Sequence, residues 1–519
     1  MNERPIVAVR GGRIRGVWRS GSAAFLGIPF AAPPVGTLRF AAPARAPSWD
    51  GVLDAGDYGP TPQRRPFGPV TTIPEPCIPG DSTLNVNVFT PAPADTSAKL
   101  PVLVWIHGGG FFAGSPASPW YDGAAFNRDG VVTVTISYRL GFDGFGWIED
   151  APTNRGVLDQ IAALEWVQEN IQAFGGDPAR VTIGGQSAGA GSVLTLLAIP
   201  TAQHLLSAAI AQSGVVRGRS LAAARETGQR FARQMGVAAT RFGWSTLSED
   251  RILDGQQALY APGDAVASPE HRATSMVQVM TGRGVGEHLA FVPHIDGELI
   301  TEDPVDSMLA GVGAGKPLLV GSNAHEFTTV MNALREPLRQ HDPNALLTTV
   351  GVNAEAAERL QAAFPGFDTA LLLGQLMSER MFRIPLVDLF EARETAGAAA
   401  GTWLFDFRWT PASGGLAAHC FELPFVWDLL DAPGVTESLG DDPPSELATT
   451  MHRAWVRFIE NGDPGWPACS PGERPGMVFD THSDLDPDPY RLEEELRVMA
   501  LPVAHPSGNP IEGRATPSP

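Results

Sequence analysis

A serine lies in a glycine-rich stretch of the chain, VTIGGQSAGAGS at residues 181–192. Gly185, Ser187 and Gly189 fit the pattern G-x-S-x-G, and the apolar run before them is typical of a short buried strand. Where this pattern joins a strand to a helix, a sharp turn exposes the serine hydroxyl as a nucleophile, and its neighbours must be small. The N-terminus of the following helix also favours a developing anion. The pattern is weak by itself in a chain with 57 glycines, but its position between a strand and a helix makes Ser187 a candidate nucleophile.

A second glycine motif, HGGGF at residues 107–111, follows the apolar run PVLVWI. Consecutive glycines let backbone N–H groups turn toward a negative oxygen, which is what the oxyanion hole of an acyl-transfer enzyme requires. An ordinary glycine turn would explain this motif if it stood alone. Because both motifs occur, and in the order that the chemistry needs, we interpret it as part of an oxyanion hole.

Strand and helix patterns alternate along residues 101–198, where both motifs lie. PVLVWI and VVTVTIS are continuous apolar runs, typical of strands buried on both faces. Residues 158–174 carry an apolar face at helical spacing, and two glycines end this predicted helix. Asp177-Pro178 is expected to turn the chain into the strand before Ser187. This alternation predicts an α/β fold built on a parallel sheet with crossover helices.

Composition limits the class of protein. The 519 residues are 43% hydrophobic and 18% charged, which suits a large globular core, and the net charge of −20 argues against nucleic acid as a partner. Cys77, Cys420 and Cys469 form neither a disulfide framework nor a metal-type spacing. The N-terminus has no apolar signal core and the chain has no long apolar run, so we expect a cytoplasmic protein with no membrane segment. A secretion signal removed from the sequence is the alternative.

The whole stretch from Val7 to Pro467 resembles the type-B carboxylesterases, a family that includes the cholinesterases, and in particular its bacterial members. The resemblance lies in FLGIPFAAPPVGTLRF, LNVNVFTP, VWIHGGGFFAG, ISYRLGFDGFG, the block from NRGVLDQ through GGQSAGAGSV, AQSG, and AAHCFELPFVW. It implies the α/β-hydrolase fold, with a large, mostly parallel central sheet and helices on both faces. We expect one such domain over residues 1–505 and a loose tail at 506–519. A further strand is expected at 317–321, and residues 220–290 read as more helical.

The resemblance also implies ester hydrolysis by a Ser-Glu-His triad. Ser187 matches the family nucleophile, His419 in AAHCFELPF matches the base, and Glu326 in PLLVGSNAHEF matches the acid. Asp296 in FVPHIDG is the rival for the acid, although the family's aspartate at that place belongs to a structural turn. The order Ser, Glu, His along the chain is that of α/β-hydrolases.

Residues beside the triad follow from the same resemblance. The oxyanion N–H donors are expected from Gly109, Gly110 and Ala188. Ser213 in AQSG matches a serine near the triad that orients Glu326 or His419, or else caps the end of a strand. Gln186 is expected to lie beside the nucleophile, where the family usually has glutamate. No metal or cofactor is expected to take part.

Three departures from the family bear on the substrate. Gln186 removes a negative charge that would favour a cationic leaving group, and Cys420 replaces the usual glycine after the catalytic histidine. The segment 59–86, where relatives carry a disulfide loop with a cation-binding aromatic, holds only Cys77 and no tryptophan. We therefore expect neutral esters rather than choline esters as substrates.

Aromatic residues near the glycine motif suit such a substrate. Phe111, Phe112 and Trp120 are candidates to contact a neutral acyl or aryl group. A hydrolase of amides or carbamates would use the same machinery and is the first alternative. A non-catalytic adhesion or scaffold protein is the second, but such relatives typically lack the serine. The expected partner is a small ester, the chain is expected to be monomeric, and no membrane association is expected.

Overall fold

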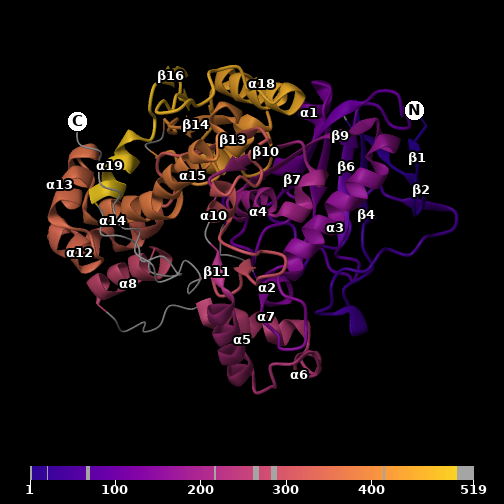
Figure 1. The fold of residues 1–519 in the computed structure, drawn as a ribbon, viewed down its shortest axis with the longest axis horizontal. Coiled ribbons are helices and arrows are strands. Elements are labelled where there is room, and N and C mark those ends of the chain that lie inside the picture. The colour runs from indigo at the N-terminus through magenta and orange to yellow at the C-terminus, as the bar shows by residue number, and fades with distance from the viewer. Residues whose placement is uncertain are drawn as a thin grey trace.

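An eleven-stranded mixed sheet forms the centre of the protein, in the order β16-β15-β14-β13-β10-β9-β7-β8-β6-β4-β3 (Figure 1). The structure is a computed structural model, and it describes residues 3–19, 21–65, 71–214, 218–260, 268–281, 289–412 and 415–499. The tail predicted at 506–519 lies outside these residues. Neighbouring strands run parallel from β8 through β15, and antiparallel pairs complete the two edges.

The strands of this sheet come from most of the length of the chain. The antiparallel strands on one side are β3 (Val17–Arg19), β4 (Ser22–Pro29) and β6 (Asn85–Thr90), and β16 (Asp484–Asp486) lies at the other edge. The parallel strands are β7 (Leu100–Ile106), β8 (Val132–Ile136), β9 (Gly176–Gln186), β10 (Ala208–Gln212), β13 (Leu318–Asn323), β14 (Thr402–Phe407) and β15 (Gly476–Phe479). The runs PVLVWI, VVTVTIS and PLLVG therefore form strands at about the predicted places.

Strand β7 shows how the two faces of the sheet are covered. Its alternate residues enter different cores: Val102, Val104 and Ile106 pack into one cluster, and Leu103 and Trp105 into another. The first cluster contains residues of α3 (Arg155–Asn170), α4 (Ala188–Leu197) and α15 (Ile384–Thr395). The second contains residues of α16 (Leu423–Val426) and α18 (Ser445–Asn461). Both faces are buried, as continuous apolar strands require.

Register brings the polar residues to one edge of the sheet. Gln186 of β9 lies opposite Gln212 of β10, and Gln212 lies opposite Gly321 of β13. Because the three strands are parallel, the segments that follow them emerge side by side. Ser187 and the turn after Asn323 thus lie at the same carboxyl edge, where α/β folds place their ligands.

The remaining elements lie around this sheet. Near the N-terminus are β1 (Ile6–Val9), β2 (Gly12–Arg15), β5 (Val52–Asp54), α1 (Ala124–Arg128) and α2 (Gly141–Phe145). The middle of the chain forms β11 (Arg219–Ser220), α5 (Leu221–Met235), α6 (Arg241–Ser245), α7 (Glu249–Tyr260), α8 (Pro269–Thr281), β12 (His294–Ile295) and α10 (Pro304–Leu309). The later helices are α11 (Arg335–Leu338), α12 (Pro343–Thr349), α13 (Ala354–Ala363), α14 (Thr369–Ser378), α17 (Val435–Leu439) and α19 (Arg491–Met499). Figure 1 shows α8, α12, α13 and α14 grouped on the side away from β1 and β2, where they share a third core.

The helix and the turn predicted before the strand of Ser187 differ in how well they match the structure. The helix predicted at 158–174 is α3 followed by a 3-10 segment, η3 (Ile171–Phe174), and Gly175 ends it at φ 82°. The turn predicted at Asp177-Pro178 is wrong as stated, because β9 already begins at Gly176. These residues instead lie in an irregularity of β9, since its pairing with β7 shifts register there.

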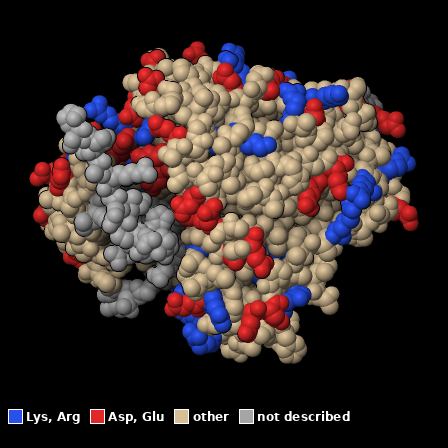
Figure 2. Space-filling view, viewed as in Figure 1, with Lys and Arg blue, Asp and Glu red and all other residues tan. Residues whose placement is uncertain are grey.

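No helix in the part of the chain that the structure describes is long and apolar enough to cross a membrane. Acidic and basic side chains are interspersed over the face shown in Figure 2. The net charge of −20 is therefore not gathered into one block on that face.

Candidate active site

The sharp turn at Ser187 links β9 to α4. Ser187 has φ 58° and ψ −124°, in the half of backbone space that favours glycine. Its N–H donates to Gln212 O at 2.9 Å, and its carbonyl accepts from Gly191 N at 2.9 Å. Residues 181–186 and 188–197 are buried, whereas Ser187 is partly exposed. The fold therefore presents one serine hydroxyl at the carboxyl edge, with backbone strain of about 1–3 kcal/mol.

Glycines permit this turn for a steric reason. A Cβ added to Gly189 would lie 2.0 Å from Ile106 O, and one added to Gly185 would lie 2.5 Å from the carbonyl carbon of Gly189. Helix α4 thus touches the backbone of β7 and β9 at its first turn. The prediction that small residues must flank Ser187 is confirmed at both positions.

A histidine and a glutamate meet next to this turn. His419 Nδ1 lies 2.5 Å from Glu326 Oε2, and the Glu326 side chain is fully buried. The other carboxylate oxygen accepts the N–H of Asn323 at 2.7 Å, and His419 N donates to Glu326 O at 3.0 Å. The acid turn, residues 322–328, and the segment around His419 are thus joined by backbone as well as by side chain. This arrangement holds the ring with Nδ1 on Glu326, which leaves Nε2 on the opposite edge, toward Gln186.

The imidazole of His419 is held in a mostly apolar environment. Phe327 meets it edge-on with ring centroids 5.1 Å apart, and Phe382 lies against it at 4.9 Å. Burial lowers the pKa of His419, but the neighbouring Cys420 and Glu326 raise it by more, so the net pKa lies well above the ordinary value of 6.5. Burial raises the pKa of the Cys420 thiol. Cys420 also has φ 75°, where the family usually has glycine.

Gln186 occupies the position beside the nucleophile, as expected. Its Nε2 lies 3.3 Å from His419 Nε2, and its Oε1 is buried with no hydrogen-bond partner among the described residues. Within the same residues Ser187 Oγ has no hydrogen bond. If His419 carries its proton on Nδ1, toward Glu326, its Nε2 is free to accept a hydrogen bond from a neighbouring donor. Hydrogen bonds of this kind are often long in ligand-free sites and tighten when substrate binds.

The glycine loop lies directly above the turn. Gly109 and Gly110 have φ 111° and 61°, conformations that favour glycine, and a Cβ on Gly108 would lie 3.1 Å from Ser187 Cβ. Among the described residues, neither Gly109 N nor Gly110 N donates a backbone hydrogen bond. His107 supports the loop: its Nδ1 lies 2.8 Å from Gly108 O, and burial lowers its pKa to about 4. The ring is therefore neutral at ordinary pH.

Asp296, the rival acid, has a different set of partners. Its Oδ2 accepts from Thr153 Oγ1 at 2.6 Å and from Asn154 Nδ2 at 2.8 Å. Its Oδ1 accepts backbone N–H groups from residues 298–300 at 2.9 to 3.0 Å. Oδ1 is thus held by the local turn and Oδ2 by the segment before α3, which fits the structural role that the family resemblance gave to this aspartate.

Ser213 and the three aromatic candidates are placed less favourably. Ser213 follows β10 at φ 52°, and its Oγ is buried with no partner among the described residues, so no bond to Glu326 or His419 is seen.

Trp120 is fully buried and its indole donates to Pro433 O, so it cannot line an open cavity; packing, not substrate contact, explains it. Phe111 is 93% buried, against Phe145. Only Phe112 is partly exposed, next to Gly110.

The sequence analysis missed a second buried carboxyl group in the site. Glu422 Oε1 accepts from Gln212 Nε2 at 3.0 Å, and its Oε2 accepts from Asn323 Nδ2 at 2.8 Å. Burial and the charge of Glu326 raise the pKa of Glu422 to about 7. The Glu422 carboxyl thus connects the end of β10, at Gln212, to the acid turn, at Asn323. Its position three residues after His419, inside a quoted motif, was the available signal.

Comparisons with known proteins bear on the family and the fold of the chain. Residues 3–476 match the model of the carboxylesterase family. Para-nitrobenzyl esterase of Bacillus subtilis is 32% identical over 514 residues, covering 96% of this chain and 98% of that protein. Fumonisin B1 esterase of Sphingopyxis macrogoltabida is 32% identical over 463 residues, covering 85% of this chain and 79% of that protein. A carboxylesterase structure from Geobacillus stearothermophilus superposes with a TM-score of 0.80 at 31% identity, over 95% of this chain and all of the other.

The contact between α4 and β7 leads to a stability prediction. Gly189→Ala should lower the unfolding midpoint, because the added methyl group overlaps Ile106 O and overpacking costs about 1–3 kcal/mol. Gly315→Ala is the matched control, since a Cβ there meets nothing within 4 Å. Denaturant unfolding of both variants measures the difference. Equal midpoints would show that the turn tolerates a side chain at residue 189.

Proposed function

The chain belongs to the carboxylesterase family, and on this premise we propose that it hydrolyses neutral carboxylic esters through an acyl-enzyme formed on Ser187. It has the α/β-hydrolase fold and is a carboxylic ester hydrolase. The finer proposal rests above all on one observation. His419 Nδ1 lies 2.5 Å from a buried carboxylate, and the ring's Nε2 faces the residue next to Ser187.

The proposed reaction starts with proton transfer from Ser187 to His419. As Ser187 Oγ attacks the ester carbonyl, His419 Nε2 takes its proton, and Glu326 holds the ring and stabilises its positive form. The alcohol leaves with the proton from His419. Water then repeats the same steps on the acyl-enzyme and releases the acid. The raised pKa of His419 reflects in part the stabilisation of the imidazolium by Glu326, and His419 can accept the Ser187 proton only in its neutral form, above that pKa.

Three backbone N–H groups are proposed to hold the tetrahedral oxyanion. Gly109 and Gly110 have the positive φ angles that glycine allows, in a loop whose first glycine, Gly108, lies against Ser187. Their N–H groups donate to no backbone carbonyl of the described chain. Ala188 is the first residue of α4, where helix geometry leaves N–H groups without a partner. Donors fixed before the reaction need no reorganisation when charge develops. Strands from Val17 to Asp486 share the sheet that carries these parts, which supports a single catalytic domain.

The proposed substrate class follows from the charges beside the nucleophile. The residue against His419 is an uncharged amide, Gln186, and the partly exposed neighbours of the site include Phe112 and Phe327. One relative is named for a para-nitrobenzyl ester. This surrounding favours neutral aryl or alkyl esters, since Gln186 supplies no carboxylate beside the nucleophile to compensate a buried cation.

The two acid candidates can be separated by pH-dependent kinetics. Glu326→Gln should lower kcat by about 10³–10⁴-fold in a folded protein, because the imidazole loses its orienting charge. Glu326 raises the pKa of His419, so wild-type activity is lost as pH falls through that raised pKa; without the carboxylate the acid limb should move to lower pH. Asp296→Asn is the matched control and should alter stability more than kcat. A collapse of kcat in Asp296→Asn alone would reverse the assignment.

The substrate preference can be tested with a pair of isosteric esters. We expect kcat/KM for a neutral p-nitrophenyl or benzyl ester to exceed that for the matching choline ester. Gln186→Glu should reduce this difference by raising kcat/KM for the choline ester, and added salt should weaken that increase. Gln172→Glu adds the same charge at the opposite end of β9 and serves as the control. Equal or better hydrolysis of the choline ester by the wild type would contradict the proposal.

A further inference from the structure

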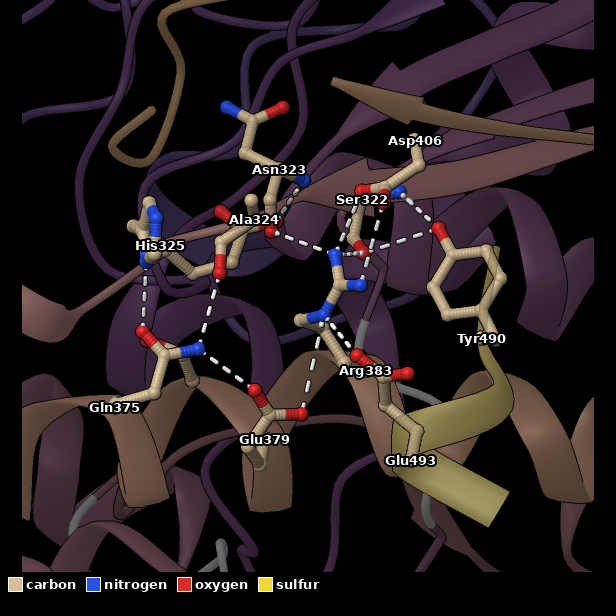
Figure 3. A network of polar contacts seen from close by, with 12 residues as sticks. Ser322, Asn323, Ala324, His325, Gln375, Glu379, Arg383, Asp406, Tyr490 and Glu493 are labelled. Atoms are coloured by element: carbon tan, nitrogen blue, oxygen red, sulfur yellow. Dashed lines mark hydrogen bonds and ion pairs between the residues drawn. The ribbon is translucent and has the colours of Figure 1, made fainter. Parts of the chain in front are cut away.

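A buried polar network adjoins the acid turn (Figure 3). Its centre is Arg383, at the end of a short π-helical segment, η6 (Glu379–Arg383). Arg383 Nη1 donates to Asp406 Oδ1 at 2.7 Å and Nε donates to Glu493 Oε1 at 2.5 Å. The guanidinium also stacks on the Tyr490 ring, 4.9 Å from its centroid. Sheet, π-helical segment and C-terminal helix therefore converge on one cation.

The network holds the start of the acid turn. Arg383 Nη1 donates to Asn323 O at 3.2 Å and to Ser322 Oγ at 3.3 Å. Tyr490 Oη accepts the N–H of Ser322 at 2.9 Å. Asn323 is also the residue whose N–H holds Glu326 Oε1. The position of the Glu326 carboxylate thus depends on groups that do not touch it.

Gln375 connects the rest of the turn to Glu379. Its Nε2 donates to Ala324 O at 3.0 Å and to Glu379 Oε1 at 2.6 Å. Its Oε1 lies 2.8 Å from His325 Nδ1. Because one amide group makes all three contacts, a shift of Glu379 would be felt at the two residues directly before Glu326.

The charges of this network do not balance if every carboxyl group is ionised. Arg383 faces three buried carboxyls, Asp406, Glu493 and Glu379. A second cation, Arg408, pairs with Asp406 and is shared with Asp486. Glu379 Oε2 is fully buried and accepts no hydrogen bond from the described residues; it lies 3.8 Å from Arg383 Nε, the atom that donates to Glu493 Oε1. The two carboxyl groups thus share one side of the same guanidinium, and a buried carboxylate oxygen without a hydrogen bond beside a second carboxylate is costly. One proton between the two groups would remove both problems.

We propose that Glu379 carries a proton that it donates to Glu493, and that this acid–carboxylate pair positions the turn of Glu326 through Gln375 and Arg383. The positioning part rests on the proposed catalytic role of Glu326. Glu379 is a positioning residue, because it touches neither the reacting atoms nor His419. When it is protonated, Oε1 accepts from Gln375 and Oε2 donates to Glu493, so each oxygen has one partner. Ionisation would replace the second contact by repulsion.

The surroundings of Glu379 set the sign of its pH dependence. The titratable and charged groups around it are Arg383, Glu493, Tyr490, Asp406, Arg408 and His325. Burial and the charge of Glu493 raise the pKa of Glu379 well above its ordinary value of 4.5, against the opposing effect of Arg383. Stability from a raised carboxyl pKa is fully present below the ordinary value and is lost as pH rises toward the raised one.

The first test measures the proton without using activity. In Glu379→Gln, the amide accepts from Gln375 and donates to Glu493, so it keeps the bonds of the protonated acid and cannot ionise. Wild type loses stability as Glu379 ionises and the variant does not. The Tm of Glu379→Gln minus that of wild type should therefore increase as pH rises from mildly acidic to alkaline. Glu446→Gln, an exposed carboxylate on α18, is the control and should show a difference that does not change with pH. A flat difference for Glu379→Gln would overturn the proposal, because it would show that Glu379 is ionised throughout.

The second test measures positioning. Glu379→Ala should lower kcat on the order of 10²-fold with little change in KM, as expected for misplacement of a catalytic group, and Glu379→Gln should restore most of the loss. The ratio of kcat in Glu379→Gln to that of wild type should also rise with pH. If kcat of Glu379→Gln is as low as that of Glu379→Ala, the positioning role is overturned. If Glu379→Ala does not fold, the change with pH of the kcat ratio between Glu379→Gln and wild type decides. The stability test is unaffected by failure of the proposed triad, which Glu326→Gln tests separately.

Discussion

The hydrogen bond from His419 Nδ1 to Glu326 Oε2 joins two segments 93 residues apart in the chain. They meet because β13 and β14 are parallel neighbours whose carboxyl ends lie at one edge of the sheet. The strained turn at Ser187 presents its hydroxyl at the same edge, since β9 is linked to β13 through β10. The sheet register therefore determines which three side chains can meet, and the surrounding hydrogen bonds determine how closely.

Two sets of buried carboxyl groups adjoin the acid turn that carries Glu326. In one set, Glu422 bridges Gln212 and Asn323, with a pKa of about 7. In the other, Arg383 neutralises part of a group of carboxyls that includes Asp406. Each ionised carboxylate near Glu326 makes an additional buried negative charge less favourable. The protein thus keeps Glu326 in place with uncharged donors, such as Asn323 N–H, more than with cations.

Sequence patterns located the chemistry well where a short motif determines its own geometry. Ser187 and its glycines could be identified because a strand, a turn and a helix occur within one stretch of sequence, and steric contact with β7 explains the choice of residue. Solvent exposure of Trp120 could not be predicted, because it depends on packing against Pro433, more than three hundred residues later in the chain. Arg383 and Gln375 were missed for a related reason: each acts through contacts between distant elements, and an isolated polar residue in a helical segment gives no local signal of burial. Glu422 lies inside the motif of His419, but its partners, Gln212 and Asn323, are far away in the sequence.

In the proposed mechanism Ser187 is the nucleophile and His419 activates it. An organophosphate that transfers its phosphoryl group to an activated serine tests this most directly, with the modified peptide located by mass spectrometry. The account predicts a single label on Ser187, formed in step with loss of esterase activity, and no labelling of Ser187→Ala. A label on another residue that accompanies the loss of activity, or an active and labelled Ser187→Ala protein, would contradict it.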